Sequence, residues 1–217
     1  MSDIRSVIKF GTDGWRAVIS DTFTFENVRI VAQATADWIL KNNPSFTNKI
    51  AAVGYDNRFL SAEYAQSFAE VFAANGIKTY LSDTSLPTPA LSFGVVQLKG
   101  VCGIMITASH NPAKFNGIKI KTSVGGAAPK DITGVVEGYL GQTEVKRADF
   151  NVSKSNGFIV VHDFKKDYVK FIRSYINLKK MKTAKFKVLA DIMHGSGRDL
   201  MKEILKGTQI KLTLMRE

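Results

Sequence analysis

Short apolar runs alternate with longer stretches of helical periodicity, and this alternation restricts the possible folds of the chain more than any other feature. The apolar runs, typical of buried strands, cover residues 50–53, 77–81, 101–106, 117–121, 186–190 and 210–214. Apolar residues spaced by three and four predict helices over 24–40, 61–74, 87–98, 131–140, 163–178 and 198–206. Elements in this order predict an α/β fold, a three-layer αβα domain with a mixed, largely parallel sheet.

Residues suited to helix ends stand at several of the expected boundaries. Thr24 and Ser61 occupy positions where an N-cap side chain is expected, and Asn75-Gly76 can end a helix in a left-handed conformation. The segment 141–157 is polar and lacks periodicity, which predicts a linker. We therefore expect one domain over 1–145 and the beginning of a second, similar domain over 146–217, which looks cut short.

Composition limits the environment and the partners of the chain. Its single cysteine, Cys102, excludes an internal disulfide and favours a reducing, cytoplasmic location. The N-terminal residues do not resemble a secretory signal, and the apolar stretches are too short to span a membrane. The net charge of +11 raises the possibility of an anionic partner.

Much of the excess positive charge lies between Lys165 and Lys187, where nine Lys and Arg residues accompany one acid, Asp167. The aromatic residues of this region have helical spacing and predict a buried stripe made of Phe164, Tyr168, Phe171 and Tyr175. A solvated helix face therefore accounts for the charge better than a nucleic-acid or membrane surface, and we expect neither of these partners.

The segment Thr107-Ala108-Ser109-His110-Asn111-Pro112 has the highest density of reactive groups and follows an apolar strand directly. Ligand sites of open α/β sheets lie just past the carboxyl ends of strands. Ser109 could be a nucleophile or carry a phosphate, with His110 and Lys119 supplying positive charge. A polar loop that caps a helix explains the same pattern from spacing alone, and both interpretations stay open at this point.

Two further segments could contribute to an anion site. In Phe10-Gly11-Thr12-Asp13-Gly14-Trp15-Arg16, a tight turn could present amide groups and Arg16 could present its guanidinium to a phosphate. In Gly54-Tyr55-Asp56-Asn57-Arg58, which again follows a strand, Asp56 and Arg58 could brace the site. A hairpin turn and a structural ion pair are the alternatives.

Several familiar motifs are missing. The sequence contains no Walker loop, no dinucleotide-binding glycine pattern and no cysteine–histidine zinc set. Gly195-Ser196-Gly197 lacks the spacing of a nucleophile elbow. Ser109 and His110 are adjacent, which argues against a triad. His162 and His194 are isolated in the sequence and are expected to be structural.

Taken in order, these segments resemble the α-D-phosphohexomutase family, which includes phosphoglucomutases, phosphomannomutases and phosphoglucosamine mutases. The resemblance runs from 10–16 through 54–58, Pro87-Thr88-Pro89, 107–112 and 116–119 to 191–197, with Thr-Ala-Ser-His-Asn-Pro as its most specific motif. It implies a cytoplasmic isomerase of carbohydrate metabolism that interconverts hexose 1-phosphate and hexose 6-phosphate, of glucose or mannose, through a bisphosphate intermediate.

The resemblance also implies roles for individual residues. Ser109 would be the phosphoserine, and its phosphate would bind Mg²⁺, while hexose 1,6-bisphosphate would act as activator. The other catalytic residues would be His110, Lys119 and Arg16. The residues that bind substrate or phosphate would be Thr12, Arg16, Arg58, Ser109, Asn111 and Lys119.

One part of the family pattern is absent from the sequence. The metal loop, of the form Asp-Gly-Asp-x-Asp-Arg, does not occur, so the ligands of Mg²⁺ other than the phosphate on Ser109 are missing. We therefore expect an N-terminal fragment that is inactive alone and that could associate with itself through its shortened second domain. A non-catalytic module that binds phosphosugars, other anions or a protein partner is the alternative.

Overall fold

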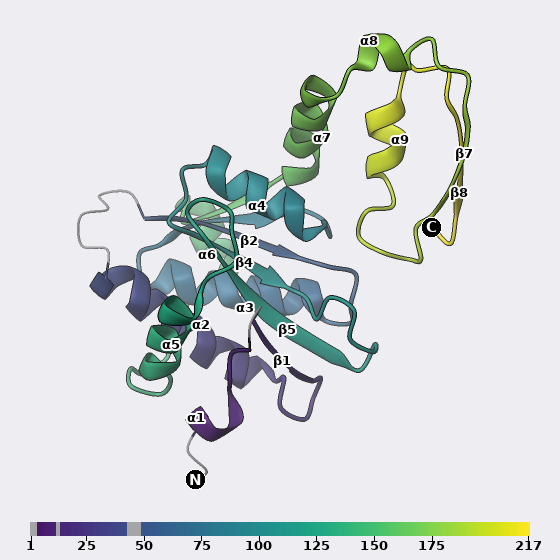
Figure 1. The fold of residues 1–217 in the computed structure, drawn as a ribbon. Helices are drawn as coiled ribbons and strands as arrows, with labels where there is room; N and C mark the ends of the chain where they lie inside the picture. Colours follow the sequence, from purple (N-terminus) through teal and green to yellow (C-terminus); the bar gives the residue numbers. More distant parts are fainter. Residues whose placement is uncertain (1–3, 12–13, 43–48) are drawn as a thin grey trace.

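The structure is a computed structural model that describes residues 4–11, 14–42 and 49–217 (Figure 1). Its main feature is a six-stranded sheet in the order β1-β5-β4-β2-β3-β6. These strands are β1 (Trp15–Val18), β2 (Ile50–Tyr55), β3 (Lys78–Ser82), β4 (Cys102–Ile106), β5 (Phe115–Thr122) and β6 (Ile159–His162). The four strands β4, β2, β3 and β6 run parallel, whereas β5 is antiparallel to both β4 and β1.

Helices cover both faces of this sheet (Figure 1). On one face lie α2 (Phe25–Asn42) and α3 (Ser61–Ala74), with α5 (Lys130–Tyr139) against α2 and α6 (Phe150–Ser155) against α3. The other face carries α4 (Thr88–Gln97), with α7 (Phe164–Tyr175) packed against it. The short α1 (Ile4–Val7) precedes the sheet. The predicted three-layer α/β fold with a mixed, largely parallel sheet is confirmed.

The alternation of side chains along the central strands produces two hydrophobic clusters. Val53 and Ile104 point to the larger cluster beneath α2 and α3. The residues next to them in sequence, Ala52 and Met105, point to the smaller cluster, which contains Phe164 of α7. Strands buried on both faces read as continuous apolar runs, which is why their positions could be predicted from sequence.

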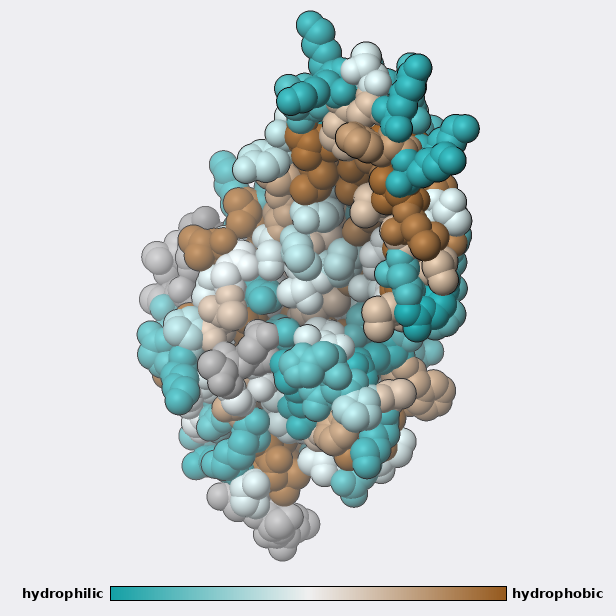
Figure 2. All heavy atoms as spheres, turned by 45° about the vertical axis from the view of Figure 1, so that its right-hand side comes forward, coloured by the Kyte–Doolittle hydropathy of each residue, from teal (hydrophilic) through white to brown (hydrophobic). Residues whose placement is uncertain are grey.

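A second, smaller unit follows α7 and lies beyond the end of that helix in Figure 1. It contains α8 (Leu178–Met181), β7 (Lys187–Asp191), α9 (Leu200–Leu205) and β8 (Lys211–Met215). β7 and β8 form a parallel pair, and α9 lies between them in sequence. Figure 2 shows apolar side chains among hydrophilic ones on the upper part of the molecule. Phe186 and Leu189 of this unit are both well exposed.

The linker predicted over 141–157 is wrong in part, because this segment contains α6. The carboxylate of Asp149 caps α6 by accepting a hydrogen bond from the Val152 amide at 2.9 Å. The strand that follows, β6, pairs with β3 at the edge of the six-stranded sheet. A six-residue helix offers too little periodicity to be recognised. The predicted boundary at residues 145/146 stays a prediction.

Two expectations about helix ends had different outcomes. Thr24 caps α2, since its hydroxyl accepts a hydrogen bond from the Asn27 amide at 3.2 Å. Ser61 does not cap α3: the N-cap is Leu60, with φ 60°, and Ser61 is the first helical residue. The Ser61 hydroxyl donates instead to the Asp56 carboxylate at 2.9 Å. The Ser61 side chain, which the sequence suggested as a helix cap, therefore makes a tertiary contact outside the helix.

The predicted aromatic stripe is buried only at the start of α7. Phe164 is 1% exposed, whereas Phe171 is 40% and Tyr175 is 80% exposed. Phe171 stacks on Phe93 of α4 with ring centroids 4.5 Å apart. The stripe fails at its C-terminal end because α7 leaves the sheet there and leads to the second unit. No helix in the described residues is long and apolar enough to cross a membrane.

Candidate active site

Two polar loops meet at one edge of the sheet because the strands before them are parallel neighbours. Tyr55 at the end of β2 pairs with Ile106 at the end of β4. The chain beyond each strand therefore emerges at the same edge, where the Asp56 amide donates to the Ile106 carbonyl at 3.1 Å. Burial and the nearby charges of Asp83 and Glu63 raise the pKa of Tyr55 above its usual value. The pairing of β2 with β4 thus brings together the loops that contain Arg58 and Ser109, which lie more than 50 residues apart in sequence.

Ser109 lies at the exposed turn of the loop after β4. Its backbone has φ 56°, a left-handed conformation that non-glycine residues adopt at an energetic cost. The Ser109 amide donates to the Thr107 hydroxyl at 2.9 Å, and its carbonyl accepts from Arg58 at 2.9 Å. Surrounding contacts therefore hold Ser109 in a conformation that its own backbone does not favour.

Arg58 is the main brace of this loop. Its two terminal nitrogens donate four hydrogen bonds of 2.6–2.9 Å to backbone carbonyl oxygens. The acceptors are the carbonyls of Ser109, Asn111, Pro112 and Phe115. The remaining nitrogen, Nε, lies 3.4 Å from the Asp56 carboxylate. The guanidinium fork thus faces the backbone of the loop.

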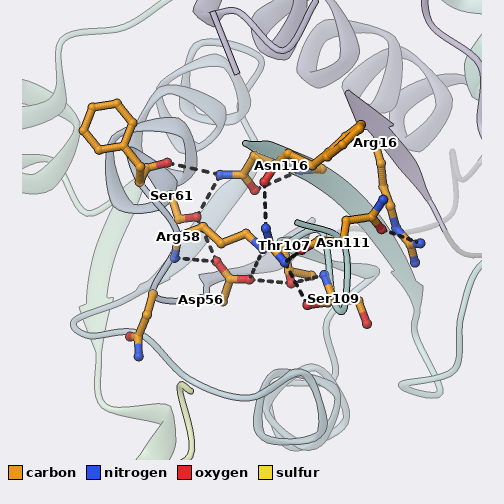
Figure 3. Close-up of polar contacts among 12 residues, drawn as sticks. Arg16, Asp56, Arg58, Ser61, Thr107, Ser109, Asn111 and Asn116 are labelled. Atoms are coloured by element: carbon orange, nitrogen blue, oxygen red, sulfur yellow. Dashed lines mark hydrogen bonds and ion pairs between the residues drawn. The ribbon is translucent and has the colours of Figure 1, made fainter. Parts of the chain in front are cut away.

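Asp56 accepts hydrogen bonds from both loops and from α3 (Figure 3). One carboxylate oxygen accepts from the Thr107 hydroxyl at 2.6 Å. The other accepts from the Ser61 hydroxyl at 2.9 Å and from the Arg58 amide at 3.0 Å. Asn116 extends these contacts into β5, because its amide nitrogen donates to the Ser61 hydroxyl at 2.9 Å. The sequence suggested a bracing role for Asp56 and Arg58 but assigned no role in the site to Thr107, Ser61 or Asn116.

The other predicted site residues occupy different positions. Arg16, on β1, donates to the Asn111 side chain at 3.1 Å. This hydrogen bond connects the predicted segments 10–16 and 107–112. His110 is exposed next to Ser109. Lys119 lies on β5 opposite Met105 and is 7% exposed. Thr12 lies outside the described residues.

A cleft of about 760 Å³ opens beside Ser109. It is lined by residues 56–59 after β2, 87–89 at the start of α4, several residues between 107 and 113, and 193–196 after β7. Ser109, His110, Asn111 and Arg58 all line it. Lys119 and Arg16 are not among the described residues that line this cleft.

His194, which the sequence suggested to be structural, also lines this cleft. Its carbonyl accepts a hydrogen bond from the Asn57 side chain at 2.9 Å, which links the second unit to the loop after β2. At the start of the same segment, a hydrogen bond from Arg216 holds the pKa of Asp191 below its usual value. Two signals in the sequence indicated a site role for the 191–197 segment, namely its position after a strand and its place in the family resemblance.

The described residues do not by themselves form a site for a divalent cation. They include no group of three or more His, Cys, Asp or Glu side chains that could hold a metal ion. The carboxylate of Asp56, which contacts the Ser109 loop through Thr107, already receives hydrogen bonds from Thr107 and Ser61. Mg²⁺ prefers several oxygen ligands, which this part of the chain does not assemble.

Comparisons with known proteins agree with this geometry. Residues 7–146 match the model of the phosphoglucomutase/phosphomannomutase α/β/α domain I. Over 213 residues, the chain is 34% identical to the phosphoglucomutases of Staphylococcus saprophyticus and Staphylococcus aureus. Each match covers 93% of this chain but 37% of the relative, so the chain spans little more than a third of these proteins.

Solved structures show the same fold. A putative phosphomannomutase from Thermus thermophilus superposes with a TM-score of 0.83 at 28% identity, covering 97% of this chain and 46% of that one. The open form of the parafusin phosphoglucomutase from Paramecium superposes with a TM-score of 0.78 at 21% identity, covering 97% and 43%. With its domain match and these relatives, the chain belongs to the phosphoglucomutase/phosphomannomutase family.

Proposed function

We propose that this chain supplies the phosphate-carrying half of a phosphohexomutase site, with Ser109 as the residue that holds the transferable phosphate. The observation that supports this most strongly is the position of Ser109. It is exposed at the carboxyl end of β4, on the rim of the cleft, in a backbone conformation that Arg58 and Thr107 hold in place. Phosphoryl transfer depends mainly on positioning and on positive charge, and a braced serine on a cleft meets the first requirement.

The proposed reaction moves phosphate between the 1- and 6-positions of a hexose. The bond between the Ser109 oxygen and phosphorus breaks while the free hydroxyl of the sugar phosphate bonds to that phosphorus, and the proton of this hydroxyl is transferred to the released Ser109 oxygen. In the return step the Ser109 oxygen bonds to the other phosphorus of the bisphosphate, the bond from that phosphorus to the sugar oxygen breaks, and the Ser109 proton is transferred to the freed sugar oxygen. Glucose and mannose phosphates are the proposed substrates, and hexose 1,6-bisphosphate is the proposed activator.

The residues around Ser109 would divide the remaining work. His110, beside it on the cleft, would orient the hydroxyl and the phosphate. Arg16 and Lys119 would contact the transferring phosphate or assist proton movement, and Thr12 would bind phosphate. Arg16 already reaches the loop through Asn111. We propose that Arg58 acts by bracing, since its terminal nitrogens are engaged with loop carbonyls.

Mg²⁺ would neutralise charge on the phosphate of Ser109 when bound. The acidic metal loop of the family does not occur in this sequence. We therefore propose that these 217 residues can accept a phosphate but do not complete the mutase cycle by themselves.

Incubation with radiolabelled glucose 1,6-bisphosphate and Mg²⁺ tests the proposal, with Ser109→Ala as the key variant and Ser92→Ala as the control. We expect label on the wild-type and Ser92→Ala chains and none on Ser109→Ala. In a separate turnover assay, we expect no conversion of glucose 1-phosphate to glucose 6-phosphate. Binding of the bisphosphate without label on any serine would favour the non-catalytic anion-binding module. Robust turnover would contradict the proposed division of the reaction.

A further inference from the structure

A closed set of hydrogen bonds lies directly behind the Ser109 loop, and we call it the polar circuit (Figure 3). It connects five residues through side chains and backbone: Asp56, Ser61, Asn116, Gly117 and Thr107. Four strand or helix ends meet in it, those of β2, α3, β4 and β5. Ser61, Thr107 and Asn116 are each at most 4% exposed. Buried polar groups of this kind are favourable only when they are satisfied, as they are here.

The direction of each hydrogen bond follows from the chemistry of the groups. A carboxylate only accepts, so the Thr107 hydroxyl must donate its single proton to Asp56, over 2.6 Å. Its lone pairs are then directed elsewhere, and the Ser109 amide donates to that oxygen at 2.9 Å. Asp56 therefore determines which way Thr107 points, and Thr107 determines where the Ser109 amide is held.

The other oxygen of Asp56 keeps the carboxylate in place independently of Thr107. It accepts from the Arg58 amide at 3.0 Å as well as from Ser61. Loss of the Ser61 hydroxyl would therefore weaken the circuit without removing the link from Asp56 to Ser109. Loss of the Thr107 hydroxyl would remove that link while Arg58 still contacts the Ser109 carbonyl.

We infer that Asp56 is a positioning residue that acts through the Thr107 hydroxyl to hold Ser109 in its left-handed conformation on the rim of the cleft. The hydrogen bond to the Ser109 amide offsets the backbone cost of φ 56°. The importance of this link for phosphoryl transfer rests on the proposed function, whereas its effect on the conformation of Ser109 does not.

Amide hydrogen exchange of Ser109, measured by NMR on the 217-residue chain, tests the conformational link. In Thr107→Val and Asp56→Ala we expect the Ser109 amide to exchange roughly tenfold faster than in the wild type. An effect of this size is expected when one hydrogen bond of a charge-assisted chain is lost. Thr107→Ser should restore it to within about threefold, because the hydroxyl is present again. Ser61→Ala should lower thermal stability but leave the Ser109 amide protected.

The rate of phosphate uptake from glucose 1,6-bisphosphate tests the functional consequence. Thr107→Val should take up phosphate at least about tenfold more slowly, and Thr107→Ser should recover most of the rate. Ser67→Ala, a buried serine of α3 outside the circuit, is the control and should match the wild type. A purely structural role would not separate Thr107→Val from an equally destabilised Ser61→Ala.

The exchange and phosphate-uptake experiments test the inference and the proposed function separately. Unchanged Ser109 exchange in Thr107→Val, or equal acceleration in Ser61→Ala, would overturn the inference. Faster exchange with an unchanged rate of phosphate uptake would support the conformational link and overturn its importance for phosphoryl transfer. If the wild-type chain takes up no phosphate, the proposed function fails, and the exchange measurement still decides whether Asp56 positions Ser109.

Discussion

At the scale of single residues, the best-defined feature of the site is Arg58, whose guanidinium group faces the protein backbone. Arg58 was predicted to brace the site from its position after a strand, and the family resemblance implied that it also binds phosphate. Only the tertiary structure could distinguish them, since the carbonyl groups that it contacts belong to a loop about 50 residues later in the chain. Ser109, by contrast, could be identified from its motif, because the reactive group and its neighbours are contiguous in sequence.

Arg58→Lys should be costly although the charge is kept. A single ammonium group cannot reproduce a planar fork that contacts four carbonyls, so we expect a loss of about 2–4 kcal/mol in the free energy of unfolding. Denaturant titration measures this loss. Arg29→Lys is the matched control, because Arg29 donates one side-chain hydrogen bond, to Ser67 at 2.9 Å, and should cost about 1 kcal/mol or less. Equal costs for the two variants would contradict the bracing role.

Cys102 should be inert in the folded chain. Burial raises the pKa of its thiol from 9.0 to about 12, so the reactive thiolate is scarce at pH 8.5. We expect iodoacetamide to leave the native chain unmodified and to modify it fully in denaturant, as read by intact mass. Because the raised pKa disfavours the thiolate only in the folded state, this group should lower stability as the pH rises above about 9. Rapid modification of the native chain would contradict the buried position.

At the scale of elements, the order of the longer helices and of six strands could be predicted, but β1, β6, the short helices and the pairing of the strands could not. Nearly continuous apolar runs indicated β2 and β4, and shorter or interrupted apolar runs indicated β3, β5, β7 and β8. Nothing in those runs showed that β5 is antiparallel to β4 or that β6 adds to the edge of the first sheet. Pairing depends on contacts distant in sequence, and short elements such as α6 depend on one cap and a few packed side chains.

Glycines in two helices offer a test of how α4 and α7 pack. A Cβ added at Gly94 of α4 would lie 2.3 Å from the buried ring of Phe164, so Gly94→Ala should destabilise the chain by about 1–3 kcal/mol. Gly134→Ala in α5 meets no atom within 4 Å and should stabilise it by about 0.5–1 kcal/mol through helix propensity. Thermal unfolding of both variants measures the difference. A stabilising Gly94→Ala would contradict the packing of Phe164 against α4.

At the scale of the whole molecule, the cleft depends on two units that approach each other. Its walls come from the loops after β2 and β4 and from the 193–196 segment of the second unit. The sequence resemblance indicated each segment, but their convergence depends on how α7 carries the chain away from the sheet. For that reason His194 appeared isolated in the sequence although it faces the same cleft as Ser109.

Arg173 connects α7 to the second unit and should be needed for its stability. Its guanidinium contacts the carbonyl oxygens of Glu203, Ile204 and Lys206 at 2.7–3.0 Å. We expect Arg173→Ala to accelerate hydrogen exchange within 187–215 while the six-stranded sheet stays protected. Lys170→Ala, one turn earlier and facing the groove between α4 and α7, is the control. Uniform acceleration across both units would contradict a local role.

Mass spectrometry of the chain after incubation with glucose 1,6-bisphosphate and Mg²⁺ determines whether Ser109 carries the phosphate. Intact mass reports whether one phosphoryl group has been added, and fragmentation of the peptide that contains the 107–112 segment reports which residue holds it. We expect a single phosphoryl group, on Ser109. A chain that stays unmodified, or that carries its phosphate on another residue, would contradict the proposed role of Ser109.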